Sequence, residues 1–226
     1  MCGRFAQRTD AKRLAKAFRV EDVPEVEPRY NVAPTQQILG VYESVDGREI
    51  KYFKWGLIPS WAKDPSIGAK LINARSETVT EKPSFREAFK KRRCIIPADG
   101  FYEWQRTGSS KQPFFFRMHD DRPFGFAGLW EQWKDKQGGE VIESCTILTT
   151  EANELLQTVH DRMPVILHPQ DYELWLDEDV RKQGFREELL RPFPASEMVS
   201  YPVSTLVNST RNHGAELIGE VKINSA

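Results

Sequence analysis

Cysteine is scarce in this sequence, and its pattern excludes two structural uses. Three cysteines occur among 226 residues, at Cys2, Cys94 and Cys145. An odd, widely spaced set does not form a disulfide framework, and no Cys-x-x-Cys or paired Cys/His spacing indicates a zinc site. The sequence also lacks a Gly-rich phosphate loop and a Gly-x-Ser-x-Gly elbow. We therefore expect neither a metal nor a cofactor.

Long apolar runs and an excess of one charge are also missing. No run approaches the roughly 18 apolar residues that are needed to span a bilayer. Charged residues interrupt the N-terminal segment, where a signal peptide would need an apolar stretch. We therefore expect a cytoplasmic protein that does not enter a membrane. The formal net charge is −1, so any nucleic-acid binding would depend on a local basic patch.

Strand patterns dominate the middle of the chain, and helical patterns flank them. This mixture predicts an α+β fold, a single domain with a curved, barrel-like, mainly antiparallel sheet and peripheral helices. Two long segments, 21–36 and 57–70, are predicted loops and candidate ligand surfaces. Strands are expected at 3–6, on both sides of Asp46-Gly47, and at 94–97, 101–106, 113–118, 124–130, 141–149, 165–167 and 199–203. Helices are expected around 10–18, 83–90, 151–157, 170–176 and 179–190.

The N-terminus carries the sharpest chemical feature. Met1 precedes a small residue, Cys2, and aminopeptidases remove methionine in that context. The product would have an α-amine and a thiol two carbons apart. With a reference pKa of ~7.7–8.0, the α-amine would be the first to attack an aldehyde, and the sulfur could then close a thiazolidine ring. The alternative is that Cys2 is simply a small second residue.

Charge alternates with reactive side chains near this end. In an extended segment, Cys2 and Arg4 would share one face, which would place a cation suited to phosphate beside the thiol. The same spacing recurs at Asn73 and Arg75, and again at His160 and Arg162. The chain has many arginines, so the pattern alone only suggests a phosphate track.

Two titratable side chains stand in unusual contexts. Glu103 lies among the aromatic residues of a predicted strand, where desolvation would raise its pKa and suit it to acid–base work. His160 lies beside Asp161 and could move protons. The alternatives are a solvent-facing glutamate and a structural histidine. Asn73 would ordinarily hydrogen-bond a turn, and Trp61 would either anchor its loop or stack on a base.

Eight segments together resemble one family, the abasic-site-processing proteins, also called SOS-response-associated peptidases. They follow the family's order over nearly the whole chain. The segments are Met1-Cys2-Gly3-Arg4-Phe5, Tyr30-Asn31-Val32-Ala33-Pro34, Trp55-Gly56-Leu57-Ile58-Pro59, Ile72-Asn73-Ala74-Arg75, Arg93-Cys94-Ile95-Ile96-Pro97-Ala98-Asp99, Phe101-Tyr102-Glu103-Trp104, His160-Asp161-Arg162-Met163-Pro164 and Gly214-Ala215-Glu216-Leu217-Ile218.

The resemblance implies one domain over residues 1–226, with its core at about 2–218, and a basic DNA channel. It implies that Cys2, freed of Met1, bonds to the ring-opened sugar of an abasic site. Asn73 would orient the nucleophile, Glu103 would move protons, and His160 would open the sugar ring or serve a lyase branch. The phosphates would be held by Arg4, Arg75 and Arg162, and the flanking bases would meet Pro34 and Trp61.

The implied partner is single-stranded DNA that contains abasic sites, next to duplex, bound by a monomer that joins the nucleoid when it is on DNA. The family is also associated with removal of its own Met1. Two other readings stay open from the residues. One is an N-terminal-nucleophile or cysteine peptidase that acts on other proteins with Cys2. The other is a non-catalytic reader of single strands that uses Trp61 and the arginines.

Overall fold

Five strands close into a barrel at the centre of the molecule. The computed structural model describes residues 2–108, 110–135, 138–139, 141–177 and 187–223. Around the ring, each strand pairs with two neighbours in the order β3, β4, β10, β9, β6 and back to β3, and the β10–β4 pair is parallel while the others are antiparallel. The strands are β3 (Gln37–Ser44), β4 (Gly47–Trp55), β6 (Arg93–Ala98), β9 (Phe124–Lys134) and β10 (Val141–Glu151).

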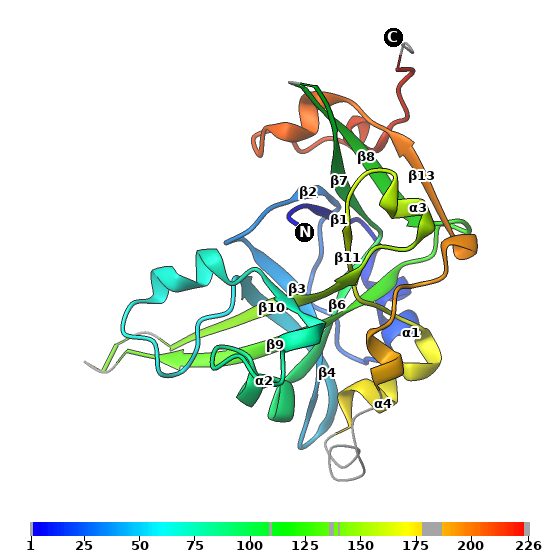
Figure 1. Ribbon diagram of the computed structural model, residues 1–226. Coiled ribbons are helices and arrows are strands. Elements are labelled where there is room, and N and C mark those ends of the chain that lie inside the picture. The colour runs from blue at the N-terminus through cyan, green and yellow to red at the C-terminus, as the bar shows by residue number, and fades with distance from the viewer. Residues whose placement is uncertain (1, 109, 136–137, 140, 178–186, 224–226) are drawn as a thin grey trace.

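A second sheet of five antiparallel strands stands beside the barrel (Figure 1). Its two longest strands form a hairpin whose far end projects away from the barrel (Figure 1). Its order is β13 (Met198–Pro202), β8 (Ser110–Met118), β7 (Gly100–Thr107), β1 (Phe5–Gln7) and β2 (Arg29–Val32).

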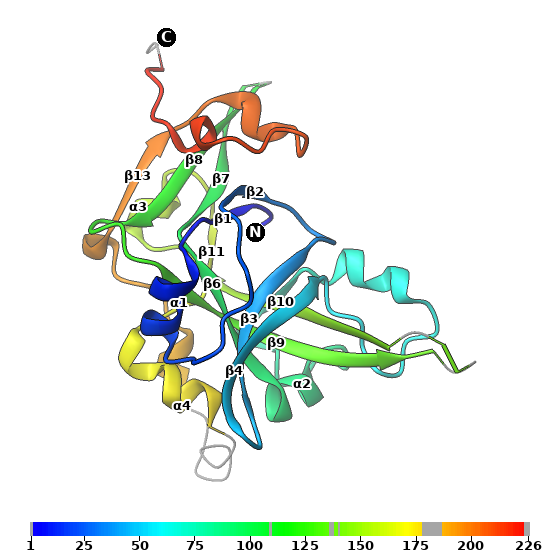
Figure 2. The ribbon, with the colours of Figure 1, turned by 180° about the vertical axis from the view of Figure 1, so that it is seen from behind.

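Short elements complete the fold at the periphery. The short strands pair with β10 or β9, and the helices lie outside the sheets (Figures 1 and 2). The strands are β5 (Asn73–Arg75), β11 (Arg162–Pro164) and β12 (Ile166–Leu167). The α-helices are α1 (Ala11–Phe18), α2 (Arg86–Lys91), α3 (Glu154–Gln157) and α4 (Tyr172–Leu176). Short 3₁₀ helices occupy Pro65–Lys70, Ser76–Thr78, Pro169–Asp171, Glu187–Leu190, Ala195–Glu197, Thr205–Asn208 and Ala215–Ile218.

Strand β1 fixes the start of the chain between the two sheets. It pairs with β2 on one side and β7 on the other, and all three of its residues are buried. The Phe5 ring meets the rings of Trp55 and Phe126 edge-on, with centroids 5.2 and 5.8 Å apart. Because an aromatic ring buried in this way contributes roughly 1.5–3 kcal/mol, Phe5 anchors the N-terminal segment against the barrel core. Figure 2 shows the N-terminus at the junction of the two sheets.

The predicted fold class is confirmed, because the chain forms one α+β domain with a curved, mainly antiparallel sheet and peripheral helices. The prediction of a continuous loop over 21–36 was wrong in part, since Arg29–Val32 form β2. Its pairing partner, β1, is distant in sequence, so local patterning did not reveal it. Of the predicted helix at 179–190, residues 179–186 lie outside the described residues, and Glu187–Leu190 form a 3₁₀ turn. No helix in the described part of the chain is long and apolar enough to cross a membrane.

Gly100, at the start of β7, allows a close approach that another residue would block. A Cβ at this position would lie 2.2 Å from Cζ of the buried Phe115 ring. Overpacking of this kind costs roughly 1–3 kcal/mol. We expect Gly100→Ala to lower the free energy of unfolding by that amount in urea titrations.

A second substitution, at Phe115, tests whether a clash with this ring causes the loss of stability. Phe115→Leu should recover part of the loss in the Gly100→Ala background, because the shorter side chain leaves room for the methyl group. Strictly additive losses in the double variant would contradict a clash between these two positions.

Candidate active site

Cys2 lies three residues before β1 and packs into the core beside the barrel strands. Its side chain is fully buried within the central core cluster, and the Asn73 side-chain amide donates a 2.9 Å hydrogen bond to the Cys2 carbonyl. Asn73 is held by β5, which pairs in parallel with β10 opposite Ile147. The Asn73 Oδ1 atom is buried and has no hydrogen-bond partner among the described residues. One end of this amide therefore fixes the backbone of Cys2, and the other is available to a group that is not yet present.

Glu103 reaches the same region from β7. The antiparallel register sets Phe5 opposite Phe101, so residues before Phe5 run beside residues after Phe101. Glu103 is only 3% exposed, and burial raises the pKa of its carboxyl group to about 7. The expectation of a desolvated carboxylate is confirmed, and a solvent-facing Glu103 is excluded. A carboxyl group with this pKa can both give and take a proton near neutral pH.

The surroundings of the Cys2 thiol disfavour its thiolate form. Burial raises its pKa well above the ordinary value, and the nearby negative charge of Glu103 raises it further. This coupling also shows that Glu103 and Cys2 are electrostatic neighbours. The thiol is therefore protonated across the physiological range, and any thiolate chemistry would have to follow a change at the chain end.

His160 stands just beyond α3, on the other side of the cavity from β7. Its Nδ1 accepts a 3.0 Å hydrogen bond from the Arg162 backbone N–H and lies 3.0 Å from Oδ1 of Asp161. In the neutral ring the proton then resides on Nε2. Burial lowers the pKa of His160, Asp161 opposes that effect and the charge of Arg106 adds to it. A neutral imidazole is thus favoured, as a base requires.

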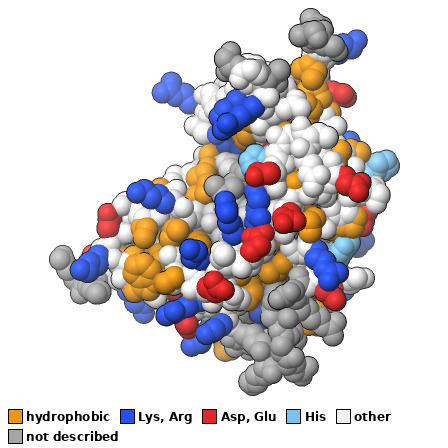
Figure 3. Space-filling view, viewed as in Figure 1, with side chains coloured by type: hydrophobic (Ala, Val, Ile, Leu, Met, Phe, Trp, Pro, Cys, Tyr) orange, Lys and Arg blue, Asp and Glu red, His pale blue; other side chains and the backbone are white. Residues whose placement is uncertain are grey.

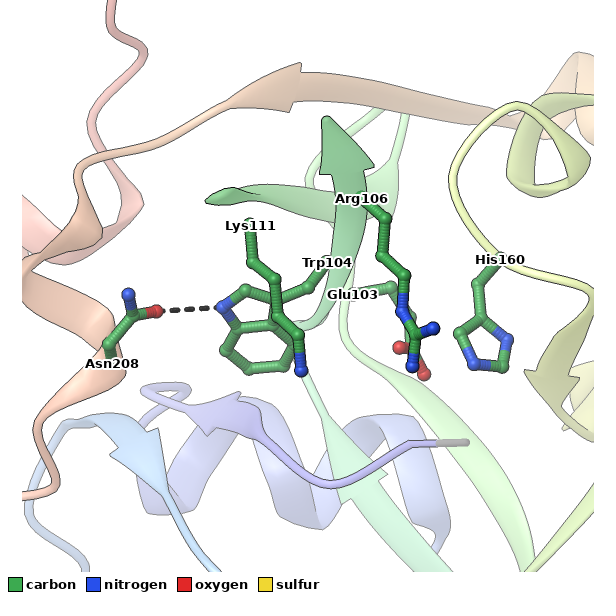
Figure 4. Close-up of a pocket in the computed structure, with 6 residues that line it drawn as sticks. All are labelled: Glu103, Trp104, Arg106, Lys111, His160 and Asn208. Carbon is green, nitrogen blue, oxygen red and sulfur yellow. Dashed lines mark hydrogen bonds between the residues drawn. The ribbon is translucent and has the colours of Figure 1, made fainter. Parts of the chain in front are cut away.

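A cavity of about 480 Å³ brings Glu103 and His160 together (Figure 4), and Cys2 and Asn73 are not among its lining residues. Glu103 and His160, 57 positions apart in the sequence, both line it. Trp104 also lines it, and its indole Nε1 donates a 2.7 Å hydrogen bond to Oδ1 of Asn208. The remaining lining residues are Arg106 and Lys111 from the β7–β8 hairpin. Four of the lining residues, Trp104, Arg106, Lys111 and Asn208, were not identified from the sequence.

The three arginines predicted to hold phosphate differ in availability. Arg75 is exposed. The guanidinium of Arg162 is held by both carboxylate oxygens of Glu77, at 2.5 and 3.0 Å, and by the Thr149 carbonyl at 2.7 Å. Arg4 is half-buried and points to the interior partners described next. Figure 3 shows basic and acidic side chains mixed on this face around a histidine, in keeping with the small net charge.

Arg4 and Asn31 join the two ends of the chain. Arg4 Nη1 donates to Oδ1 of Asn31 and to the Val207 carbonyl, both at 2.7 Å. The Asn31 amide nitrogen donates to the carbonyls of Ser209 and Asn212 at 3.0 and 2.9 Å. Asn31 is 3% exposed, so these are interior hydrogen bonds that would be costly to break. They fix the segment 204–212, which carries Asn208 into the cavity wall.

The two residues predicted to meet bases lie outside the cavity lining. Trp61 is 53% exposed, and its indole N–H donates a 3.4 Å hydrogen bond to the Pro83 carbonyl. Pro34 is half-buried in the turn between β2 and β3, where Thr35 has a φ of 71°. Among the described residues, no group of three His, Cys, Asp or Glu side chains could hold a metal ion.

Comparison with known proteins identifies the family of the chain. The family model for "SOS response associated peptidase (SRAP)" matches residues 1–210. The chain is 44% identical over 222 residues to "Abasic site processing protein YoqW" of Bacillus subtilis, covering 96% of this chain and 99% of that protein. It is 34% identical to "Abasic site processing protein HMCES" of Gallus gallus, covering 99% of this chain and 79% of that protein.

A solved structure also matches. A protein from Bacteroides thetaiotaomicron superposes with a TM-score of 0.81 at 30% identity, covering 96% of this chain and all of that one. A likeness of this extent, in sequence and in structure, shows both the fold and the family. The chain belongs to the SOS response associated peptidase family.

Replacing Glu103 by Gln should make stability less dependent on pH. The protonated carboxyl of Glu103 supports the folded state fully below its ordinary pKa of 4.5, and this support is lost as pH rises through the folded pKa of about 7. Glutamine has no such ionisation. Between pH 5 and pH 8, the stability of Glu103→Gln relative to wild type should rise by about 2–3 kcal/mol in urea titrations.

The exposed Glu81 supplies the control. Glu81→Gln should shift stability by the same small amount at both pH values. An equal wild-type-to-variant difference for Glu103→Gln at pH 5 and pH 8 would show that Glu103 is not held neutral by burial.

Proposed function

We propose that this protein processes abasic sites in single-stranded DNA by forming a covalent bond through Cys2 after Met1 is removed. The family and the names of its relatives support abasic-site processing. The observation that carries the finer proposal is the convergence of Asn73, Glu103 and His160 on the chain end. A buried acid of pKa about 7, a neutral imidazole and an anchoring amide form an acid–base set around a residue that can carry an α-amine.

The chemistry needs an amine before it needs a thiol. In the chain with Met1, the Cys2 nitrogen is an amide and the thiol is buried and protonated. Loss of Met1 turns that nitrogen into an amine, and removing a neighbour can only increase the access of Cys2 to the cavity. The high thiol pKa is compatible with this order, because sulfur reacts second.

Each step balances in atoms and protons. The ring-opened sugar presents an aldehyde carbon, to which the α-amine adds to give a carbinolamine. Protonated Glu103 gives its proton to the hydroxyl, which leaves as water, and the resulting iminium returns its N–H proton to the Glu103 carboxylate, which leaves a neutral imine. The thiol adds to the imine carbon, and its proton passes to the nitrogen, so the thiazolidine forms with net loss of one water. The regenerated carboxyl group of Glu103 can act again in either direction.

His160 and Asn73 take supporting roles in this scheme. The neutral imidazole opens the cyclic sugar by taking the proton of the anomeric hydroxyl group, so that the bond from the anomeric carbon to the ring oxygen breaks and the ring oxygen takes up a proton to become a hydroxyl group. The same base serves a lyase branch in which the imine is diverted to strand cleavage. Asn73 holds the Cys2 carbonyl, and its unpartnered Oδ1 accepts a hydrogen bond from the new amine. The same site would remove Met1 by hydrolysing the Met1–Cys2 peptide bond, with one water supplying the hydroxyl of the released methionine and a proton of the new Cys2 amine.

The bond would shield the lesion. A sugar held as a thiazolidine cannot undergo β-elimination into a strand break, which matters most where no complementary strand exists to guide repair. We propose that the protein acts as a cytoplasmic monomer, a single domain whose core spans about 2–218, on single strands next to duplex. Arg75 and Arg162 would contact phosphates, and Pro34 and Trp61 would contact flanking bases.

A denaturing gel tests the covalent bond. Protein whose loss of Met1 is confirmed by mass spectrometry should shift a single-stranded oligonucleotide that contains an abasic site, and not an intact one. Cys2→Ala should abolish the shifted band, whereas Cys94→Ala, which alters another buried thiol, should retain it. Wild-type protein that lacks Met1 and yields no band would refute the proposal. Turnover of unrelated peptides would instead indicate a general peptidase.

The rate of bond formation should report the ionisation of Glu103. Its acidic form is lost as pH rises through about 7, so the wild-type rate should fall on the alkaline side. Glu103→Gln should slow the reaction roughly 10²–10⁴-fold and lose the alkaline fall. Single-turnover rates from pH 5.5 to 9 measure both effects. A Glu103→Gln profile parallel to wild type would exclude proton transfer by this residue.

A further inference from the structure

The cations that line the cavity are not the ones that the sequence suggested. Arg106 and Lys111 line it, and both are exposed. Within the described ranges, neither makes an ion pair or a side-chain hydrogen bond, whereas Arg4 and Arg162 are held by interior or acidic partners. Figure 4 shows both side chains extending from the hairpin into the cavity, Lys111 in front of Trp104 and Arg106 beside His160.

We propose that Arg106 and Lys111 form a binding site for backbone phosphates of the single strand that passes through the cavity. This inference rests on the proposed function and assigns the strand's phosphodiester groups to a position that none of the predicted arginines occupies. The charge of Arg106 acts on His160, so a phosphate between the two cations would lie next to the acid–base residues. An arginine offers paired donors to phosphate and a lysine offers a mobile charge, so together they suit a flexible backbone.

The pairing register of β7 and β8 also supports a phosphate site at Arg106 and Lys111. Arg106 lies directly opposite Lys111 in the β7–β8 pair, so their Cβ atoms are on the same face, roughly 5 Å apart. Like charges in this relation destabilise a hairpin, and here no acidic partner among the described residues offsets them. A pair that works against folding is best explained by a ligand that carries the opposite charge. A phosphodiester anion supplies that charge when the strand is bound.

The geometry also places this site apart from Arg75. Arg75 belongs to β5 at the barrel, whereas the two hairpin cations belong to the second sheet. A strand that contacts both would pass across the cavity between the two sheets, over Glu103 and His160. The two groups of cations would then hold phosphates on either side of the lesion.

The salt dependence of DNA binding tests the site without covalent chemistry. Anisotropy of an intact, labelled single-stranded oligonucleotide would be measured at several salt concentrations with protein carrying Cys2→Ala. For single strands, each lost phosphate contact lowers the slope of log affinity against log salt by about 0.7. We expect Arg106→Gln and Lys111→Gln each to lower the slope by about 0.7, and the double variant by about 1.4. Lys12→Gln, an exposed cation on α1, should leave it unchanged.

A loss of folding is not expected to account for a lower salt slope in the Arg106 and Lys111 variants. Neutralising either residue relieves the like-charge pair, so the melting temperature should be unchanged or higher, and circular dichroism should be unchanged. Slopes equal to that of Lys12→Gln would overturn the proposal. A reduced slope combined with no covalent band in the gel would support this site while refuting the covalent function, so the two proposals fail separately.

Discussion

Everything at this site depends on how the N-terminal segment is held. Cys2 lies three residues before β1, outside the regular pairing of the sheet, so it needs other contacts to fix it. Strand β1 solves the problem by pairing with two strands at once and burying Phe5 between the rings of Trp55 and Phe126. The hydrogen bond from Asn73 to the Cys2 carbonyl then removes the remaining freedom. The proposed acid–base residues can act on Cys2 only if it is held in one position, and these contacts hold it.

The same burial that positions the end also sets the chemistry. Packing the two sheets together leaves little water around Glu103, and the loss of solvation keeps its carboxyl group largely neutral up to pH 7. A protein selected for stability alone would place an apolar residue there. The like-charged pair on the β7–β8 hairpin follows the same logic, because both features oppose folding and both face the cavity. Such local conflicts commonly mark functional sites.

The sequence was informative wherever one residue conflicted with its neighbours. Glu103 could be singled out because a charged residue stood among aromatic ones, and the fold class followed from long runs of strand pattern. Partners brought together over long distances could not be foreseen. That Arg4 holds phosphate stays a prediction, but its hydrogen bond to the Val207 carbonyl, 203 positions away, is one that no local pattern encodes. Strand β2 was missed for the same reason, since its regularity comes from pairing with β1.

The bonds that Arg4 and Asn31 make to residues 207–212 bear on how the protein is made. The first residues leave the ribosome long before the carbonyls that complete this wall of the cavity exist. Until residues 207–212 have been translated, the N-terminal segment has no finished cavity beside it. Assembly of the candidate site is thereby tied to synthesis of this late segment, and a chain terminated before it would lack the wall that Asn208 helps to build.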